Sequence, residues 1–100
     1  MSINGTWDIT MKTPIGNQEI RLVAQSDGKT VTGTQSSGSE SVEIQDGLIE
    51  GDQVTWTAQT TKPMPMQVKF TAQVDGDDMS GKAKAGLFPA ASFAGRRAEG

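Results

Sequence analysis

The chain has 100 residues and a net charge of −3, and it contains no cysteine, histidine or tyrosine. Without cysteine or histidine, the sequence excludes zinc fingers, disulfide frameworks, thiolate nucleophiles and imidazole bases, and it predicts neither a metal site nor a cofactor. The slight negative charge argues against nucleic acid or an anionic membrane as a partner, and the length suits one domain over residues 1–100.

No stretch of the chain approaches the roughly 20 apolar residues of a membrane-spanning helix. The first residues, Met1-Ser2-Ile3-Asn4, do not resemble the start of a secretory signal peptide. We therefore expect a cytoplasmic protein. The absence of cysteine agrees with that compartment without requiring it.

Strict alternation of apolar and polar residues opens the chain. From residue 3 to residue 13 the even positions are polar, and the odd positions carry Ile3, Gly5, Trp7, Ile9 and Met11. A period of two over this length predicts a β-strand with one buried face and one solvated face.

The same period returns along the rest of the chain, and no window has the 3.6-residue period of an amphipathic helix. The predicted strands cover residues 3–13, 17–26, 29–36, 40–49, 53–60, 66–74, 78–85 and 90–97. Eight strands of this length use most of the chain. The sequence therefore predicts an all-β fold, an eight-stranded antiparallel up-and-down β-barrel.

Glycine beside aspartate marks three tight turns between these strands, at Asp27-Gly28, Gly51-Asp52 and Asp75-Gly76. Asp46-Gly47 falls inside a predicted strand and indicates a bulge. Longer breaks are expected at residues 14–17, 36–39, 62–65 and 86–89. In an up-and-down barrel the tight turns and both termini then share one end, and the four longer loops share the other.

An internal repeat agrees with this layout. The pattern Ala-Gln-x-Asp-Gly at residues 24–28 is followed by Gly33, and the same pattern at residues 72–76 is followed by Gly81. We interpret it as a duplication of two four-stranded halves. The fourth and eighth strands match each other poorly.

The end with the longer loops is rich in apolar residues, which commonly mark a contact surface when they are exposed. They surround the entrance to an apolar ligand cavity, or they fold inward as a plug, or they pack in a homo-oligomer. The apolar residues at this end are Pro14, Ile15, Met64, Pro65, Met66, Leu87, Phe88 and Pro89.

The predicted interior mixes small and large side chains, so an eight-stranded barrel of this kind is either filled or holds one small ligand. Methionines suit an adaptable apolar wall. Gln35, and Gln18 if it points inward, would orient a ligand carbonyl or hydroxyl group. The candidate ligand-contacting residues are Met11, Gln35, Trp56, Met64, Met66, Leu87 and Phe88.

Gly5-Thr6-Trp7 on the first strand resembles the Gly-x-Trp signature of the calycin superfamily, which includes the lipocalins and avidins. The resemblance implies a barrel that binds a small hydrophobic molecule. It also implies that an arginine near the end of the last strand packs over the tryptophan at the closed end, and Arg97 has the suitable parity. The chain is shorter than a typical lipocalin, and it lacks the polar residues with which avidins hold biotin.

Catalytic groups are scarce in the sequence. Asp75, Asp77 and Asp78 are close together, but they lie at a tight turn and lack the spacing of a calcium-binding loop. No serine lies beside a usable base. We favour a binder of small hydrophobic molecules. The alternatives are a cofactor-independent lyase, isomerase or cyclase that uses the same cavity, and a filled barrel that oligomerises through its Met/Pro/Phe loops.

Overall fold

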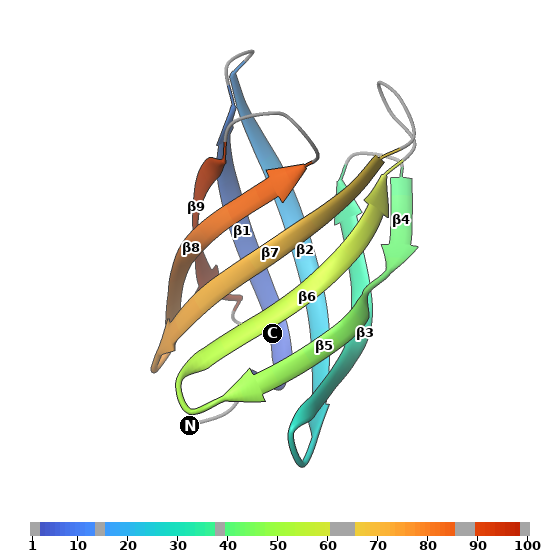
Figure 1. Ribbon diagram of the computed structural model, residues 1–100. Coiled ribbons are helices and arrows are strands. Elements are labelled where there is room, and N and C mark those ends of the chain that lie inside the picture. Colours follow the sequence, from blue (N-terminus) through green and yellow to red (C-terminus); the bar gives the residue numbers. More distant parts are fainter. Residues whose placement is uncertain (1–2, 14–15, 38–39, 61–65, 86–89, 99–100) are drawn as a thin grey trace.

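The computed structural model describes residues 3–13, 16–37, 40–60, 66–85 and 90–98, and it forms strands without a helix in these ranges (Figure 1). The sequence predicts eight strands at nearly these positions, and the ninth arises because the predicted strand 40–49 divides into two. The strands are β1 (Gly5–Thr13), β2 (Gly16–Asp27), β3 (Thr30–Ser37), β4 (Glu40–Glu43), β5 (Gln45–Glu50), β6 (Gln53–Thr60), β7 (Met66–Asp75), β8 (Asp78–Ala85) and β9 (Ala91–Arg97).

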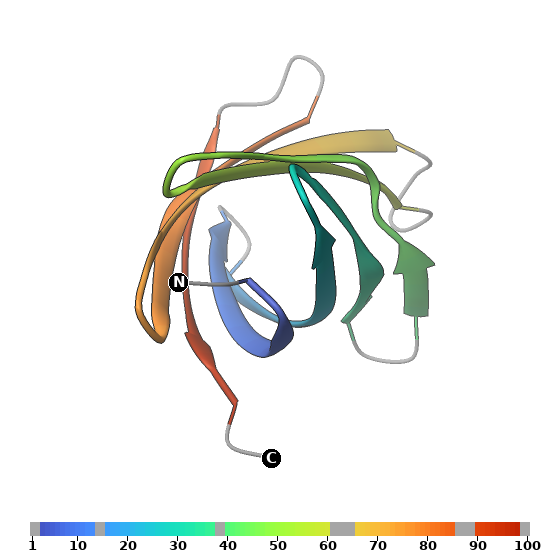
Figure 2. The same cartoon turned by 90° about the horizontal axis from the view of Figure 1, so that it is seen from below.

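These strands form one closed antiparallel sheet, seen from below in Figure 2. Neighbours along the chain pair with each other, except β4 and β5, which both pair with β3, and β9 returns to pair with β1. Because β4 and β5 occupy one place in this ring, the ring has eight places. The predicted eight-stranded antiparallel up-and-down barrel is confirmed.

The fourth place in the ring contains the predicted bulge at Asp46-Gly47. The register between β5 and β6 shifts between Gln45 and Leu48, and Asp46 has a φ of 55°, which aspartate tolerates better than most residues. Within the described residues, β4 pairs with β3 and with no other strand. The edge of β4 on the side of β6 therefore has no ladder of hydrogen bonds.

Each of the three tight turns begins on a glycine. Gly28, Gly51 and Gly76 have φ values of 67°, 61° and 64°, and each is the first residue of a two-residue loop, as a type II′ turn requires. The turn positions predicted at Asp27-Gly28 and Asp75-Gly76 are wrong by one residue. In both hairpins the aspartate still pairs within its strand, and the residue after the glycine completes the turn.

The other four connections lie at the opposite end of the barrel, and two of them are shorter than predicted. Thr13 pairs directly with Gly16, so residues 14–15 alone connect β1 to β2. Residues 38–39 alone connect β3 to β4. Glycine suggested a longer break, but Gly16 begins a strand with a φ of 122°, which needs the freedom of a residue without Cβ.

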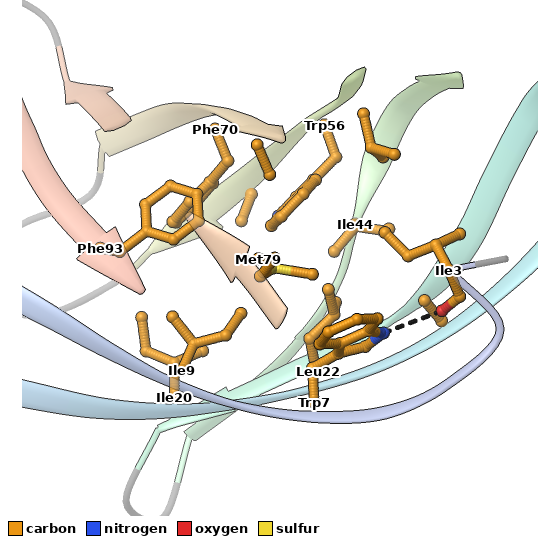
Figure 3. Packing of buried hydrophobic residues seen from close by; sticks show 14 of the residues in the cluster. Ile3, Trp7, Ile9, Ile20, Leu22, Ile44, Trp56, Phe70, Met79 and Phe93 are labelled. Atoms are coloured by element: carbon orange, nitrogen blue, oxygen red, sulfur yellow. Dashed lines mark hydrogen bonds between the residues drawn. The ribbon is translucent and has the colours of Figure 1, made fainter. Parts of the chain in front are cut away.

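Alternate residues along the strands point into the barrel and build its core (Figure 3). In β2, for example, Ile20, Leu22 and Ala24 are buried between exposed neighbours. Burying one face of every strand is what the period of two predicts. The largest fully buried side chains are those of Trp7, Trp56, Phe70, Ile9 and Leu22.

Two hairpins repeat the same close approach of neighbouring backbones. Gly33 lies opposite Ala24 in the pair of β2 and β3, and Gly81 lies opposite Ala72 in the pair of β7 and β8. A Cβ atom at either glycine would lie 1.9 Å from a carbonyl oxygen of the paired strand. Both positions therefore require glycine.

Candidate functional site

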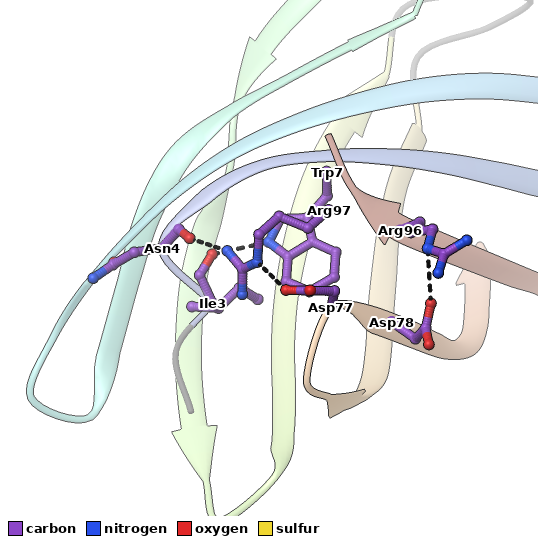
Figure 4. A network of polar contacts seen from close by, with 7 residues as sticks. All are labelled: Ile3, Asn4, Trp7, Asp77, Asp78, Arg96 and Arg97. Atoms are coloured by element: carbon purple, nitrogen blue, oxygen red, sulfur yellow. Dashed lines mark hydrogen bonds and ion pairs between the residues drawn. The ribbon is translucent and has the colours of Figure 1, made fainter. Parts of the chain in front are cut away.

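The tight-turn end of the barrel is covered by a stack on Trp7 (Figure 4). The guanidinium carbon of Arg97 lies 4.4 Å from the Trp7 ring centroid, a favourable position for a cation over an indole face. The Nε1–H of Trp7 donates to the carbonyl oxygen of Ile3 at 2.9 Å. The buried indole thus has both its polar edge and its face occupied.

Arg97 is held from two further directions. Its Nε donates to Oδ1 of Asp77 at 3.0 Å, and its Nη1 donates to the carbonyl oxygen of Asn4. A Cβ atom on Gly5 would lie 2.9 Å from that Nη1. The glycine two residues before Trp7 therefore makes room for the guanidinium group.

A small pocket of about 150 Å³ opens between the tight turns at this end. Its lining includes Ile3, Gly28, Gly51 and Asp52. Ligand pockets usually have volumes of about 300–1,000 Å³, so this one is small for an organic ligand. We assign no ligand to it.

Three aromatic side chains meet inside the barrel (Figure 3). The rings of Trp56 and Phe70 are stacked, with centroids 5.2 Å apart and planes at 7°. Phe93 lies 5.7 Å from Phe70 at 63° and 6.2 Å from Trp56 at 56°. These are the offset and edge-on arrangements that aromatic rings prefer, and all three rings are buried in the core.

Several inward side chains near the loop-rich end are small. Ala58 and Ala83 are buried there, and Ala85 and Ala91 are partly exposed. Larger inward side chains lie among them, including the buried Val68 and the partly exposed Met11. Small side chains on β6, β8 and β9 thus alternate with larger ones on β1 and β7.

Gln35 is a polar residue within this apolar interior. It is 6% exposed, and it is the buried polar or charged residue of the described part of the chain. Its Oε1 accepts a hydrogen bond from Nε1 of Trp56 at 3.1 Å. In the ring of strands β5 lies between β3 and β6, so this hydrogen bond links strands that are not neighbours.

The hydrogen bond also fixes which way the Gln35 amide points. An indole N–H is a donor only, so the oxygen and not the nitrogen of the amide must face Trp56. The NH₂ group of Gln35 then has no hydrogen-bond partner in the part of the chain that the structure describes. Two donors are left for another acceptor.

The remaining predicted site residues are not all placed. Met64, Leu87 and Phe88 lie outside the described residues. Met66 is the first residue of β7, and its side chain is likewise outside the description. Gln18 pairs with Met11 across β1 and β2 but is exposed, because it lies near the open end of its strand.

Charge is sparse on the inner face of the described strands. The charged residues that share the inward parity there are Arg97, at the tight-turn end, and Glu40, which is half-buried at the loop-rich rim. Within the described ranges, no group of three or more histidine, cysteine, aspartate or glutamate residues is arranged to hold a metal ion. None of the described residues belongs to a helix long and apolar enough to cross a membrane.

Sequence reasoning missed two partners of the predicted residues. Phe70 stacks on Trp56 and Phe93 packs against it at a tilt, and the inward parity of both was a visible signal. The bond between Gln35 and Trp56 had no such signal, because it depends on how the strands tilt and shift around the barrel.

No protein-family model matches the chain, and no curated protein matches it by sequence. Solved structures match it over nearly its whole length. A mutant of the fluorescent protein UnaG is 13% identical to this chain, with a TM-score of 0.61. The match covers 98% of this chain and 97% of the UnaG chain. Apo lipid binding protein 8 of Caenorhabditis elegans is 11% identical, with a TM-score of 0.60. The match covers 98% of this chain and 99% of that protein's chain.

A third solved structure, the REP1-NXSQ fatty acid transporter, has 10% identity and a TM-score of 0.58, with coverage of 97% of this chain and 96% of its own. At such low identities the similarity concerns the fold alone. Together with the closed ring of strands, it identifies the fold as calycin-like.

Proposed function

We propose that the protein binds a small hydrophobic or aromatic molecule inside the loop-rich half of the barrel. The observation that carries the proposal is the group of small inward side chains near the loop-rich end, where Ala85 and Ala91 on β8 and β9 are partly exposed. Small inward side chains on neighbouring strands leave room that large ones would fill. Solved structures of the same fold include a lipid binding protein and a fatty acid transporter, which supports an apolar ligand.

The walls of the proposed site suit such a ligand. We propose that the buried, stacked pair of Trp56 and Phe70 forms the inner wall of the site, and that Met11 adds an unbranched, adaptable side chain at the rim. Gln35 supplies a polar group among them. We propose that Met64, Met66, Leu87 and Phe88 complete the entrance.

Titration with ethylnaphthalene, followed by NMR, tests the proposal with a control inside the same molecule. We expect the indole N–H signal of Trp56 and the side-chain amide signals of Gln35 to move with added ligand. The indole signal of Trp7, at the tight-turn end, should stay in place. A titration that moves none of these signals, or that moves both indole signals equally, contradicts the proposed site.

Filling the proposed cavity separates a hollow barrel from a filled one. Ala85 is a partly exposed inward residue at the loop-rich end. In a hollow barrel, Ala85→Leu occupies free space, so the protein keeps its stability and loses ethylnaphthalene binding. In a filled barrel the same change overpacks the core and costs about 1–3 kcal/mol. Ala94→Leu, on the exposed face of β9, is the matched control and should change neither property.

The same interior would also serve a cofactor-independent lyase, isomerase or cyclase. Binding is the better supported function, because the inward charged residues of the described strands are Arg97 and Glu40, which lie at opposite ends. Turnover of a panel of apolar carbonyl or polyene compounds would favour the enzyme. A filled barrel that assembles through its loops predicts instead that Met66→Asp shifts a larger species to monomer on size-exclusion chromatography.

A further inference from the structure

Building on the proposed function, we infer that the ligand carries an uncharged hydrogen-bond acceptor, such as a ketone, ester or amide oxygen, and that Gln35 recognises it. Among the described residues, the Gln35 side chain has a hydrogen-bond partner at its oxygen and not at its nitrogen. Trp56 occupies the amide oxygen at 3.1 Å, and the two N–H donors have no partner in the described ranges of the chain.

The hydrogen bond from Trp56 turns the Gln35 amide into a donor with a fixed direction. A free glutamine can present its oxygen or its nitrogen to a ligand, but this one cannot flip without placing its NH₂ against the indole N–H. Among the described residues no buried side-chain nitrogen or oxygen lacks a hydrogen-bond partner, so the NH₂ group of Gln35 is not fully enclosed. A hydrocarbon ligand that covers this donor without accepting from it costs free energy comparable to a lost hydrogen bond. A ligand oxygen at this place avoids that cost.

The charges around the interior favour a neutral acceptor over a carboxylate. Arg97 lies at the far end of the barrel, where Trp7, Asp77 and Asn4 engage it. The charged inward residue at the loop-rich rim of the described strands is Glu40, which is itself an acid. Within the described strands, a ligand carboxylate near Gln35 would therefore meet no cation on the inner face of the barrel.

Four naphthalenes substituted at the same ring position test the inference on the unmodified protein at neutral pH. Acetylnaphthalene and methyl naphthoate carry a neutral acceptor, naphthoate carries a charged one, and ethylnaphthalene carries none. Calorimetric titration should give acetylnaphthalene an affinity about threefold to tenfold above that of ethylnaphthalene, the range expected for one net hydrogen bond. Naphthoate should bind about tenfold more weakly than acetylnaphthalene or worse, and methyl naphthoate should recover the affinity.

Two variants assign this preference to Gln35. Gln35→Glu keeps an oxygen for the Trp56 indole but replaces the NH₂ group, so the advantage of acetylnaphthalene should vanish. Gln35→Leu should also bind acetylnaphthalene and ethylnaphthalene equally, with the affinity for ethylnaphthalene retained within about threefold. Because Gln35→Glu keeps the partner of Trp56, a failure of Gln35→Leu to fold leaves the test intact.

The outcomes distinguish this inference from the proposed function. Absence of binding by all four naphthalenes overturns the proposed function and the inference with it. Binding of ethylnaphthalene and naphthoate as tight as that of acetylnaphthalene keeps the apolar site and overturns the role of Gln35. A preference for acetylnaphthalene that survives in both variants overturns it as well.

Discussion

Trp7 joins three segments of the chain through one side chain. Its Nε1–H bonds to Ile3, its ring packs under Arg97 from the last strand, and its neighbour Gly5 leaves space for that guanidinium group. The side chain is fully buried, so its removal takes away apolar burial and two polar contacts together.

Trp7→Ala should therefore lower the free energy of unfolding by about 3–5 kcal/mol, the usual cost of truncating a buried tryptophan. Urea denaturation measures the change, and Val23→Ala, at an exposed position of β2, is the control. A nearly neutral result would show that Trp7 does not hold the tight-turn end together.

The contacts of Arg97 contribute unequally to the free energy of unfolding. Arg97→Ala should cost about 1–2 kcal/mol, because the guanidinium group over Trp7 is largely shielded from solvent. Asp77→Asn should cost less than about 1 kcal/mol, since the Asp77 side chain is 75% exposed and its ion pair is screened. Equal losses in urea denaturation would contradict the assignment of the main contact to the indole.

Whole strands come close at Gly33 and Gly81, where a Cβ would lie 1.9 Å from the carbonyl oxygen of the paired strand. Gly33→Ala and Gly81→Ala should each cost at least about 1–3 kcal/mol, because the paired strands must separate to admit a methyl group. Ser80→Ala, on the exposed face of β8, is the control. Thermal melts that match the unchanged protein would show that the hairpins can spread freely.

The open edge of β4 makes a second prediction at the scale of the strand. The amide of Ile44 donates to Gly33 in β3, so by alternation the amides of Ser41 and Glu43 point away from β3. Their hydrogen exchange should be far faster than that of Phe70 in β7, which pairs on both sides. Comparable protection at these three amides would mean that β4 is paired on its second edge.

The whole barrel depends on its last strand. β9 pairs with β8 on one side and with β1 on the other, so a chain that ends at residue 89 leaves two open edges and lacks Arg97. We expect this shortened chain to lose its folded circular dichroism spectrum, and a peptide of residues 90–100 to restore it. A shortened chain that remains folded without the peptide would contradict the role of β9 in closure.

The sequence predicts the ring of strands well because burial of one face imposes a period of two, which is visible residue by residue. It predicts the bulge for a similar local reason, since Asp46-Gly47 interrupts the alternation. Features that depend on two strands at once are harder. The exact turn at Gly28 and the short connection at residues 14–15 depend on pairing registers that a single strand does not encode.

The same distinction between single strands and pairs of strands applies to the candidate site. Parity alone indicates that Met11, Gln35 and Trp56 belong to the inner face, because each lies on an alternating strand. The hydrogen bond between Gln35 and Trp56 arises from the stagger of strands around the closed barrel. Its consequence is therefore visible only in three dimensions: a fixed amide whose two N–H donors have no partner within the described ranges.

Because the two tryptophans have different surroundings, their absorption and fluorescence report on different parts of the protein. Because the chain has two tryptophans and no tyrosine, its near-ultraviolet absorption and fluorescence come almost entirely from Trp7 and Trp56. One indole lies against a guanidinium group, and the other lies against Phe70 and an amide oxygen. A chain with Trp56→Phe thus reports optically on the tight-turn end, and a chain with Trp7→Phe reports on the interior beside Gln35.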